Sequence, residues 1–352
     1  MFKFIAPAIA GISLAVSTGV LADDVPPTPP EMVGYAQSLA EQAHRGDKRA
    51  LEFLQTHAAA EDPQAEFGLG EFYLLGKNYA QSVTWFQKSA SQGFAGGYYA
   101  LGQAYESGQG LPRDYAQAMQ MYLKAADQLP SVQTNIGLLY AHGHGVKQDY
   151  AQASSWYRKA AEAGDVEADL DLGSLYLLGQ GVPQSESEAI RWYKKAADQG
   201  IAQAEYRLGS LYAHSKSSQD YRQAAYWYDK AGQQGVAEAQ LDLGMLYQDG
   251  KGVPKDSARA IQWFQMAANQ GNGHAQYQLA NGFANGEGVP KDPFRAYQWM
   301  SIAKASLDEK DPVYSAVLKN LKDWEQQLGP AQVVQARKAA EAWLQEHGAR
   351  KE

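Results

Sequence analysis

The sequence predicts an all-α protein, a solenoid of stacked helical hairpins. A unit of roughly 35 residues recurs along the chain, and residues 236–271 show it in full. Each copy has an apolar stripe at helical spacing, a Gly-rich break with Pro, and a second apolar stripe that carries an aromatic pair. A two-helix unit cannot bury that pair by itself, so neighbouring units must cover it and the hairpins stack.

Residues 1–22 are typical of a secretory signal peptide. Lys3 precedes an apolar run that ends in Val20-Leu21-Ala22, a small-residue cleavage site. An uncleaved N-terminal anchor is the alternative, although polar residues interrupt the run and about eighteen consecutive apolar residues are usually needed to span a bilayer. We therefore expect export to the periplasm, or secretion beyond it.

Composition excludes several classes of partner and linkage. The chain has no Cys, which rules out disulfides and a lipoprotein attachment site. Its net charge is −8, and loss of residues 1–22 removes only Lys3 and brings the charge to −9. Such a surface argues against nucleic acid and anionic membranes. We expect a monomer with no membrane insertion after signal cleavage.

The remaining elements follow in order. Residues 23–30 form a Pro-rich leader, expected to be extended, and residues 31–63 predict two N-terminal capping helices. Seven hairpins occupy residues 64–307, and residues 308–352 predict two C-terminal capping helices with polar outer faces. The first helix of each hairpin carries a small residue at one position: Gly70, Gly102, Gly137, Gly173, Gly209, Gly244 and Ala280. The second helix begins after a capping residue: Asn78, Asp114, Asp149, Ser185, Asp220, Asp256 and Asp292.

Three local features carry further expectations. A Gly inside a helix costs about 1 kcal/mol relative to Ala, so its recurrence indicates that another backbone approaches there. Ser185 and Glu188 predict a capping box. Two hairpins lack the Gly-x-Gly turn: the first passes directly from Gly76 to Asn78, and the fifth has residues 214–219 in its place.

The repeated motifs Leu-Gly-x-x-Tyr, Gly-x-Gly-Val-Pro-x-Asp and Ala-x-x-Trp-Tyr-x-Lys-Ala-Ala resemble Sel-1-like repeats, which are related to tetratricopeptide repeats. The resemblance covers residues 64–306. It implies a right-handed α/α superhelix that serves as an adaptor. One secreted branch of the family is linked to penicillin binding and β-lactamase activity, but this chain lacks the cysteines that mark that branch. Other exported members resemble immunity partners of toxins, host-contact factors or envelope scaffolds.

The resemblance also implies that the first helices line a concave face, with the positions three before and four after each Gly pointing inward. An aromatic and aliphatic ladder with some polar residues suits an extended peptide or a protruding loop of a partner. Core packing between repeats is the alternative role for the first set. The predicted partner-binding residues are Phe67, Leu74, Tyr99, Glu106, Leu170, Leu177, Tyr206, Leu241, Gln248 and Tyr277.

Catalytic and metal motifs are weak. His142 and His144 form a His-x-His in a predicted turn, but no suitable third ligand is near in sequence, so we expect no metal. Ser301 and Lys304 match Ser-x-x-Lys, but they fall inside a repeat helix and no Lys-Thr-Gly accompanies them. We therefore expect no cofactor and no catalytic residue.

These observations favour an exported, non-enzymatic protein that binds one protein partner on its concave face. The partner is a peptide, a loop or a secreted effector, and the role is that of an adaptor or scaffold, or of an immunity protein that neutralises a toxin in the periplasm. Two alternatives stay open: a hydrolase acting on β-lactams or peptidoglycan, and a virulence factor that contacts a host.

Overall fold

The computed structural model describes residues 29–215 and 219–347, and within these ranges it contains helices and no strand. The all-α repeat solenoid is therefore confirmed, while its handedness stays a prediction. The chain divides into two compact units, residues 1–97 and 98–352. The predicted signal peptide and residues 23–28 of the leader lie outside the described residues.

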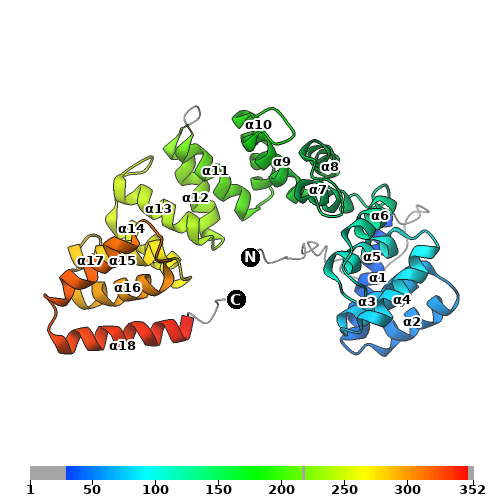
Figure 1. The fold of residues 1–352 in the computed structure, drawn as a ribbon, viewed down its shortest axis with the longest axis horizontal. Coiled ribbons are helices and arrows are strands. Elements are labelled where there is room, and N and C mark those ends of the chain that lie inside the picture. The colour runs from blue at the N-terminus through cyan, green and yellow to red at the C-terminus, as the bar shows by residue number, and fades with distance from the viewer. Residues whose placement is uncertain (1–28, 216–218, 348–352) are drawn as a thin grey trace, which may run out of the picture. The chain divides into compact units, whose positions relative to one another are not determined.

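The first unit contains α1 (Pro29–His44), α2 (Lys48–Ala59), α3 (Pro63–Leu75) and α4 (Tyr79–Ser91), with α3 packed against the other three (Figure 1). The prediction of an extended leader is wrong for Pro29 and Pro30, which form the first turn of α1. Pro is tolerated there because the first N–H groups of a helix have no partner within the helix.

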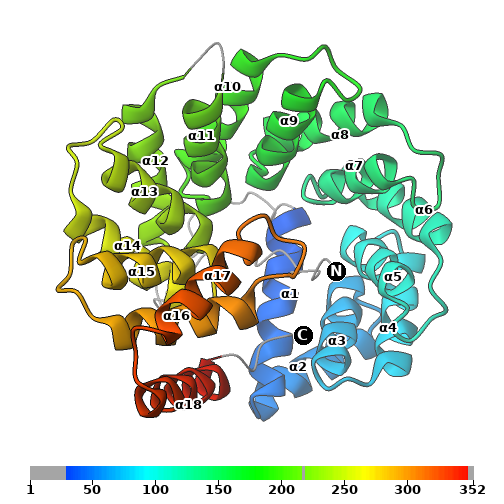
Figure 2. The ribbon, with the colours of Figure 1, turned by 60° about the vertical axis from the view of Figure 1, so that its left-hand side comes forward.

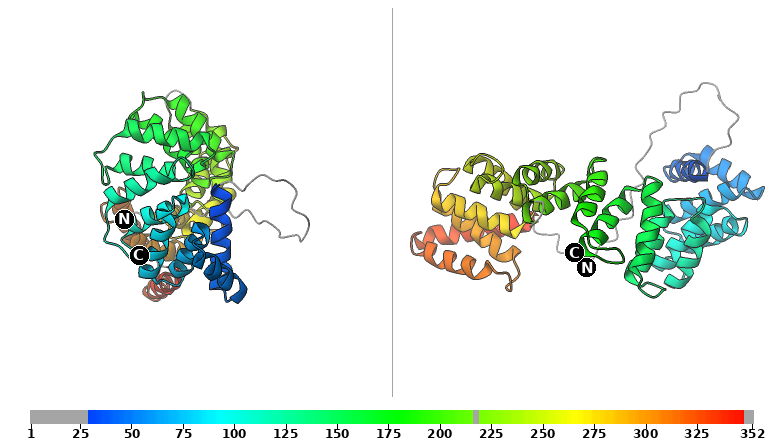
Figure 3. Two further views of the ribbon diagram at one scale, coloured as in Figure 1. Left: turned by 90° about the vertical axis from the view of Figure 1, so that its right-hand side faces the viewer. Right: turned by 90° about the horizontal axis from the view of Figure 1, so that it is seen from above.

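The second unit continues the hairpins from α5 (Ala95–Ser107), whose first turn belongs to the first unit. Each hairpin pairs a helix A with a helix B, and within this unit each B helix packs against the A helix of the next hairpin, as successive layers in Figures 2 and 3. The pairs are α7 (Val132–His142) with α8 (Tyr150–Glu162), α9 (Val166–Leu178) with α10 (Glu186–Ala197), α11 (Ala202–His214) with α12 (Tyr221–Gln233), α13 (Ala237–Asp249) with α14 (Ser257–Asn269), and α15 (Gly273–Asn285) with α16 (Pro293–Ser306). In the same scheme α3 and α5 are A helices, and α4 and α6 (Tyr115–Ala125) are B helices. Two further helices, α17 (Tyr314–Glu325) and α18 (Pro330–His347), both pack against α16.

The recurring Gly of helix A makes room for an aromatic ring of helix B. A Cβ built on Gly173 would lie 2.4 Å from Cδ1 of Tyr193, far inside van der Waals contact. We expected another backbone to approach this Gly, and that expectation is wrong, because an aromatic ring fills the space. The same pairing recurs for Gly70 with Phe86, Gly102 with Tyr122, Gly137 with Tyr157, Gly209 with Tyr228 and Gly244 with Phe264. In the last hairpin both members change together, to Ala280 and Met300.

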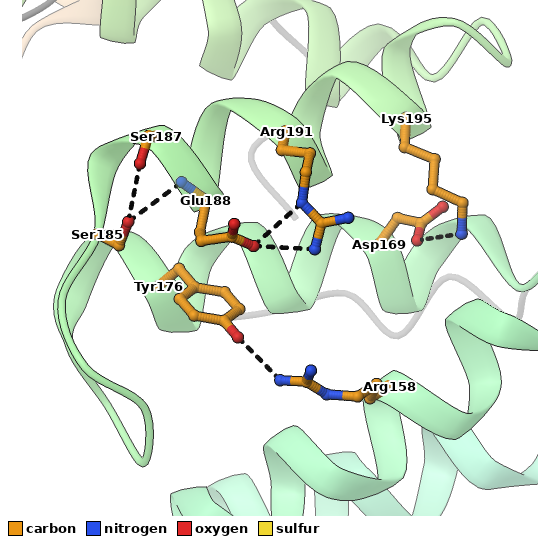
Figure 4. A network of polar contacts seen from close by, with 8 residues as sticks. All are labelled: Arg158, Asp169, Tyr176, Ser185, Ser187, Glu188, Arg191 and Lys195. Atoms are coloured by element: carbon orange, nitrogen blue, oxygen red, sulfur yellow. Dashed lines mark hydrogen bonds and ion pairs between the residues drawn. The ribbon is translucent and has the colours of Figure 1, made fainter.

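The predicted capping residues all stand at N-caps of B helices, and each side chain accepts a hydrogen bond from a first-turn N–H. The capping box is only half formed. Ser185 Oγ accepts from the Glu188 N–H at 3.2 Å, but the Glu188 carboxylate turns away and pairs with Arg191 (Figure 4). An available Arg one turn along the helix thus competes for the side chain that would close the box.

Candidate functional site

The A helices of the second unit keep one side free of packing. In α9, α11 and α13 the less buried residues recur at i, i+4, i+7 and i+11, which is one face of a helix. We call this surface the helix-A stripe. Its residues are Glu167, Asp171, Ser174 and Leu178 on α9, then Gln203, Arg207, Ser210 and His214 on α11, then Glu238, Asp242, Met245 and Asp249 on α13. Figure 2 shows α9 and α11 on one side of the unit and α10 and α12 on the other.

Five of the ten predicted partner-binding residues lie on α9, α11 and α13, the helices that carry the stripe. Phe67 is fully buried, with its ring centroid 5.8 Å from that of Phe86 and 5.7 Å from that of Phe94, so its assignment to a binding surface is wrong. An aromatic side chain at this position of the first hairpin completes a three-ring core. The other nine are partly exposed: Leu74, Tyr99, Glu106, Leu170, Leu177, Tyr206, Leu241, Gln248 and Tyr277.

Those in α9, α11 and α13 form the buried edge of the stripe. Leu170, Tyr206 and Leu241 each precede a stripe residue and pack partly against the hydrophobic core. Tyr206 lies near Tyr228, with ring centroids 5.8 Å apart. Their contribution to binding stays a prediction. The next residue along each helix belongs to the stripe: Arg207 is exposed, and Asp171 and Asp242 are partly buried.

In α9 and α13 the stripe residue two positions before the recurring Gly interacts with tyrosines of the preceding hairpin. Asp171 of α9 interacts with Tyr157 of α8, and Asp242 of α13 interacts with Tyr228 of α12 and with Tyr206 of α11. This geometry follows from the repeat, because stacking places that position of one A helix over the aromatic pair of the previous B helix. The signal in the sequence was the column itself, with Asp171, Arg207 and Asp242 in successive repeats.

Burial perturbs both aspartates. Burial raises the pKa of Asp171 to about 7, Glu167 raises it further, and Arg207 opposes the shift. Burial raises the pKa of Asp242 to about 6, against the opposing effect of His214. Burial also raises the pKa of Tyr206 to about 12, with Asp242 adding to the shift. These carboxyl groups therefore exchange protons near neutral pH, where their charge responds to whatever binds beside them.

The stripe is acidic and largely unneutralised. Five of its residues are carboxylates against a single Arg. Asp249 pairs with Lys251, with Nζ and Oδ2 2.8 Å apart. Across the described ranges, Glu167, Asp171, Glu238 and Asp242 have no ion pair. Glu167 and Glu238 are exposed and available to a partner, whereas Asp171 and Asp242 are partly buried and their carboxyl groups also interact with tyrosines.

Polar contacts behind the stripe fix the A helices in place. Asp169 of α9 is fully buried and binds Lys195 of α10, with Oδ1 and Nζ 2.9 Å apart (Figure 4). The same Nζ also donates to the Ala161 carbonyl. Arg158 of α8 donates to the Tyr176 hydroxyl of α9 at 2.8 Å. The bonds from Lys195 to Ala161 and from Arg158 to Tyr176 join successive hairpins, so they hold the stripe residues in register from one repeat to the next.

The catalytic and metal motifs do not assemble into sites. Ser301 Oγ donates to the Tyr297 carbonyl at 2.8 Å and forms no bond with Lys304. The rings of His142 and His144 lie 5.4 Å apart, and His144 stacks on Tyr115. Across residues 29–215 and 219–347, no three His, Cys, Asp or Glu side chains gather closely enough to hold a metal. No helix in these same ranges has the length and apolar character needed to cross a membrane.

Comparison with known proteins identifies the repeats. The Sel1 repeat family matches residues 63–94, 95–128, 130–165, 166–201, 202–236, 237–272 and 273–306. A crystal structure of a Sel1 repeat protein from Oxalobacter formigenes is 34% identical, covers 68% of this chain and 98% of its own, and superposes with a TM-score of 0.59. The structure of c5321, a protective antigen present in uropathogenic Escherichia coli strains, is 26% identical, covers 90% of this chain and 84% of its own, and has a TM-score of 0.41.

A curated relative matches only one section of the chain. Chitin synthase regulatory factor 3 of Schizosaccharomyces pombe is 37% identical over 83 residues, which is 22% of this chain and 9% of that protein. The chain therefore spans less than a tenth of the length of this relative.

Proposed function

This chain belongs to the Sel1 repeat family, and from that premise we propose that it is a non-enzymatic scaffold that binds a protein partner through the helix-A stripe. The observation that carries the proposal is the accessible face of α9, α11 and α13, which recurs in register over three hairpins. A repeat protein stacks its hairpins through the remaining helix faces, which leaves this one for recognition.

The chemistry of the stripe favours a partner segment with cationic side chains. Glu167 and Glu238 have no ion pair among the described residues, and Arg207, the one Arg of the stripe, interacts with Asp171. A basic segment would supply the missing charges, and Leu178 and Met245, which are 61% and 42% exposed, would contact its aliphatic parts. Complementary charges would also accelerate association at low ionic strength.

Export and the biological role form the finer part of the proposal. The apolar run after Lys3 supports export to the periplasm. There the chain would act as an adaptor or scaffold, or as an immunity protein that neutralises a toxin. The identity of the partner decides between these roles: an envelope component would indicate a scaffold, and a secreted effector would indicate immunity.

The test is capture from an envelope extract with two charge-matched variants. The stripe variant carries Asp171→Asn and Asp242→Asn, and the control carries Asp127→Asn and Glu162→Gln, which are exposed residues outside the stripe. Capture is carried out at about pH 8, above the raised pKa values of Asp171 and Asp242, so that each variant loses close to two negative charges and non-specific electrostatic retention changes to a similar extent. Retained proteins are identified by mass spectrometry, and the affinity of the purified partner is then measured by calorimetry.

Binding through the stripe predicts that the stripe variant loses the partner and the control keeps it. Equal retention by both variants would refute the assignment to this face. A third variant, Tyr206→Ala with Leu241→Ala, tests the buried edge. Loss of binding only in this variant, with unchanged circular dichroism, would move the contact from the carboxylates to the apolar edge.

A further inference from the structure

A cavity lies at the C-terminal end of the chain, away from the stripe. It has a volume of about 500 Å³ and is enclosed by α16, α17 and α18, the last three helices in Figure 1. The residues of each helix that line the cavity are three or four positions apart, so they lie on one face of that helix. On α16, for example, they are Tyr297, Ser301 and Lys304. The cavity therefore has three walls, with α16 between the other two.

One end of the cavity carries a closed polar network. The Tyr297 hydroxyl donates to Glu325 Oε1 at 2.5 Å, and Arg337 Nε donates to the same hydroxyl at 3.0 Å. Arg337 also pairs with Glu325. The Tyr297 hydroxyl and the Arg337 guanidinium hold the pKa of the Glu325 carboxyl below its usual range. These three groups satisfy one another and contribute no net charge to the cavity.

Two cations of the lining stay without a counter-ion. Lys304 and Lys322 form no ion pair or hydrogen bond among the described residues, and Lys304 attracts Glu325 only at longer range. Glu341 is the sole remaining acid of the lining. The cavity is thus positive by one charge in a chain whose net charge is −8.

The other part of the lining is apolar. Leu321 is 9% exposed, Leu344 is partly buried, and Leu318 leaves 44% of its surface accessible beside Lys322. An exposed Leu next to an unpaired Lys fits a ligand that combines an anionic head with a hydrocarbon body. The hydroxyl of Ser301 already donates to a carbonyl, so it can only accept, and the two ammonium groups are the donors that an anion would meet.

We propose that this cavity binds a small aliphatic carboxylate. Its carboxylate lies between Lys304 and Lys322, and its alkyl chain contacts Leu318, Leu321 and Leu344. The cavity offers little to the repeated amide groups of a peptide backbone, because Tyr297, Glu325 and Arg337 pair with one another. A simple acid needs only the two cations and the apolar wall.

The test is calorimetric titration of the intact chain with octanoate, with octan-1-ol and octylammonium as neutral and cationic probes of the same length. The lysine variant carries Lys304→Gln and Lys322→Gln. Lys319→Gln is the matched control on α17, since Lys319 is exposed and lies outside the cavity lining. Methyl NMR of the leucines locates the contact, and circular dichroism confirms that each variant folds.

We expect octanoate to bind, to shift the methyl signals of Leu318 and Leu321, and to lose about tenfold or more in affinity in the lysine variant while Lys319→Gln changes little. Leu318→Ser should also weaken binding. The proposal is overturned if octanoate gives no heat and no methyl shifts, if the lysine variant binds it as well as the parent, or if octylammonium binds equally tightly.

Discussion

Gly173 of α9 lies flat against the ring of Tyr193 of α10, so that a Cβ on residue 173 would stand 2.4 Å from ring carbon Cδ1. We predict that Gly173→Ala loses about 1–3 kcal/mol of unfolding free energy, because the ring must move within a packed core. Chemical denaturation monitored by circular dichroism measures this loss.

The last hairpin suggests a rescue. There Ala280 is paired with Met300, a flexible side chain that can yield to a methyl group. Tyr193→Met should therefore lower the free energy of unfolding by less in the Gly173→Ala variant than in the parent chain. Gly34→Ala on α1 is the control, since a Cβ at that position meets nothing within 4 Å. If Gly173→Ala and Tyr193→Met have additive effects in a double-mutant cycle, the ring contact does not restrict the size of the side chain at residue 173.

The Lys195 and Asp169 pair yields a second prediction, because its neighbour Lys194 provides a matched comparison. Lys195→Ala removes the partner of a fully buried carboxylate and a donor to the Ala161 carbonyl, which should cost about 1–3 kcal/mol. Lys194 pairs with Asp198 on the surface, so Lys194→Ala should lower the free energy of unfolding much less than Lys195→Ala does. Urea denaturation of both variants decides the point. Equal losses would mean that the buried pair stabilises the fold no more than the exposed one.

A third prediction concerns pH. Burial raises the pKa of Asp171 from 3.8 to about 7, so the folded state binds this proton more tightly than the unfolded state does. The contribution of Asp171 to the free energy of unfolding is therefore most favourable at pH values below its pKa in the unfolded chain, and it is lost as pH rises through about 7. Asp171→Asn should raise the melting temperature, relative to the parent, by more at about pH 8 than at about pH 5, by a few degrees at most. Asp127→Asn, a substitution on the exposed surface, should change the melting temperature by the same amount at both pH values. A shift for Asp171→Asn that is independent of pH would show that this carboxyl does not titrate in that range.

The repeat could be predicted almost completely from the sequence, because the same few residue types recur at the same spacing. The Gly column and the aromatic column were both visible in this way. Their mutual contact was not, since periodicity places a residue on a helix face but does not say which side chain of another helix meets it. Phe67 shows the same limit. The residue at the equivalent position is partly exposed in most later hairpins, but in the first unit two further rings enclose Phe67.

On α9, α11 and α13 the helix-A stripe and the predicted partner-binding residues differ by one position. A step of one position turns a side chain by about 100° around a helix, which is enough to move it from the accessible face to the buried edge. Tyr206 and Arg207 illustrate this step, since the first is partly buried and the second is exposed. The cavity around Lys304 and Lys322 lay further out of reach, because α17 and α18 do not repeat and their packing on α16 follows no period.

The second Gly of the turn gives a final prediction. Gly252 has φ of 70°, and a Cβ there would lie 2.2 Å from the carbonyl carbon of Tyr221, at the start of the preceding B helix. Gly271 also has positive φ, at 88°, but a Cβ there meets nothing within 4 Å. Both Ala substitutions therefore strain the backbone by about 1–2 kcal/mol, but only Gly252→Ala also forces two hairpins apart. Gly252→Ala should lower the melting temperature by clearly more than Gly271→Ala. Equal decreases in differential scanning calorimetry would mean that the turn does not support stacking, and that its Gly serves the local backbone alone.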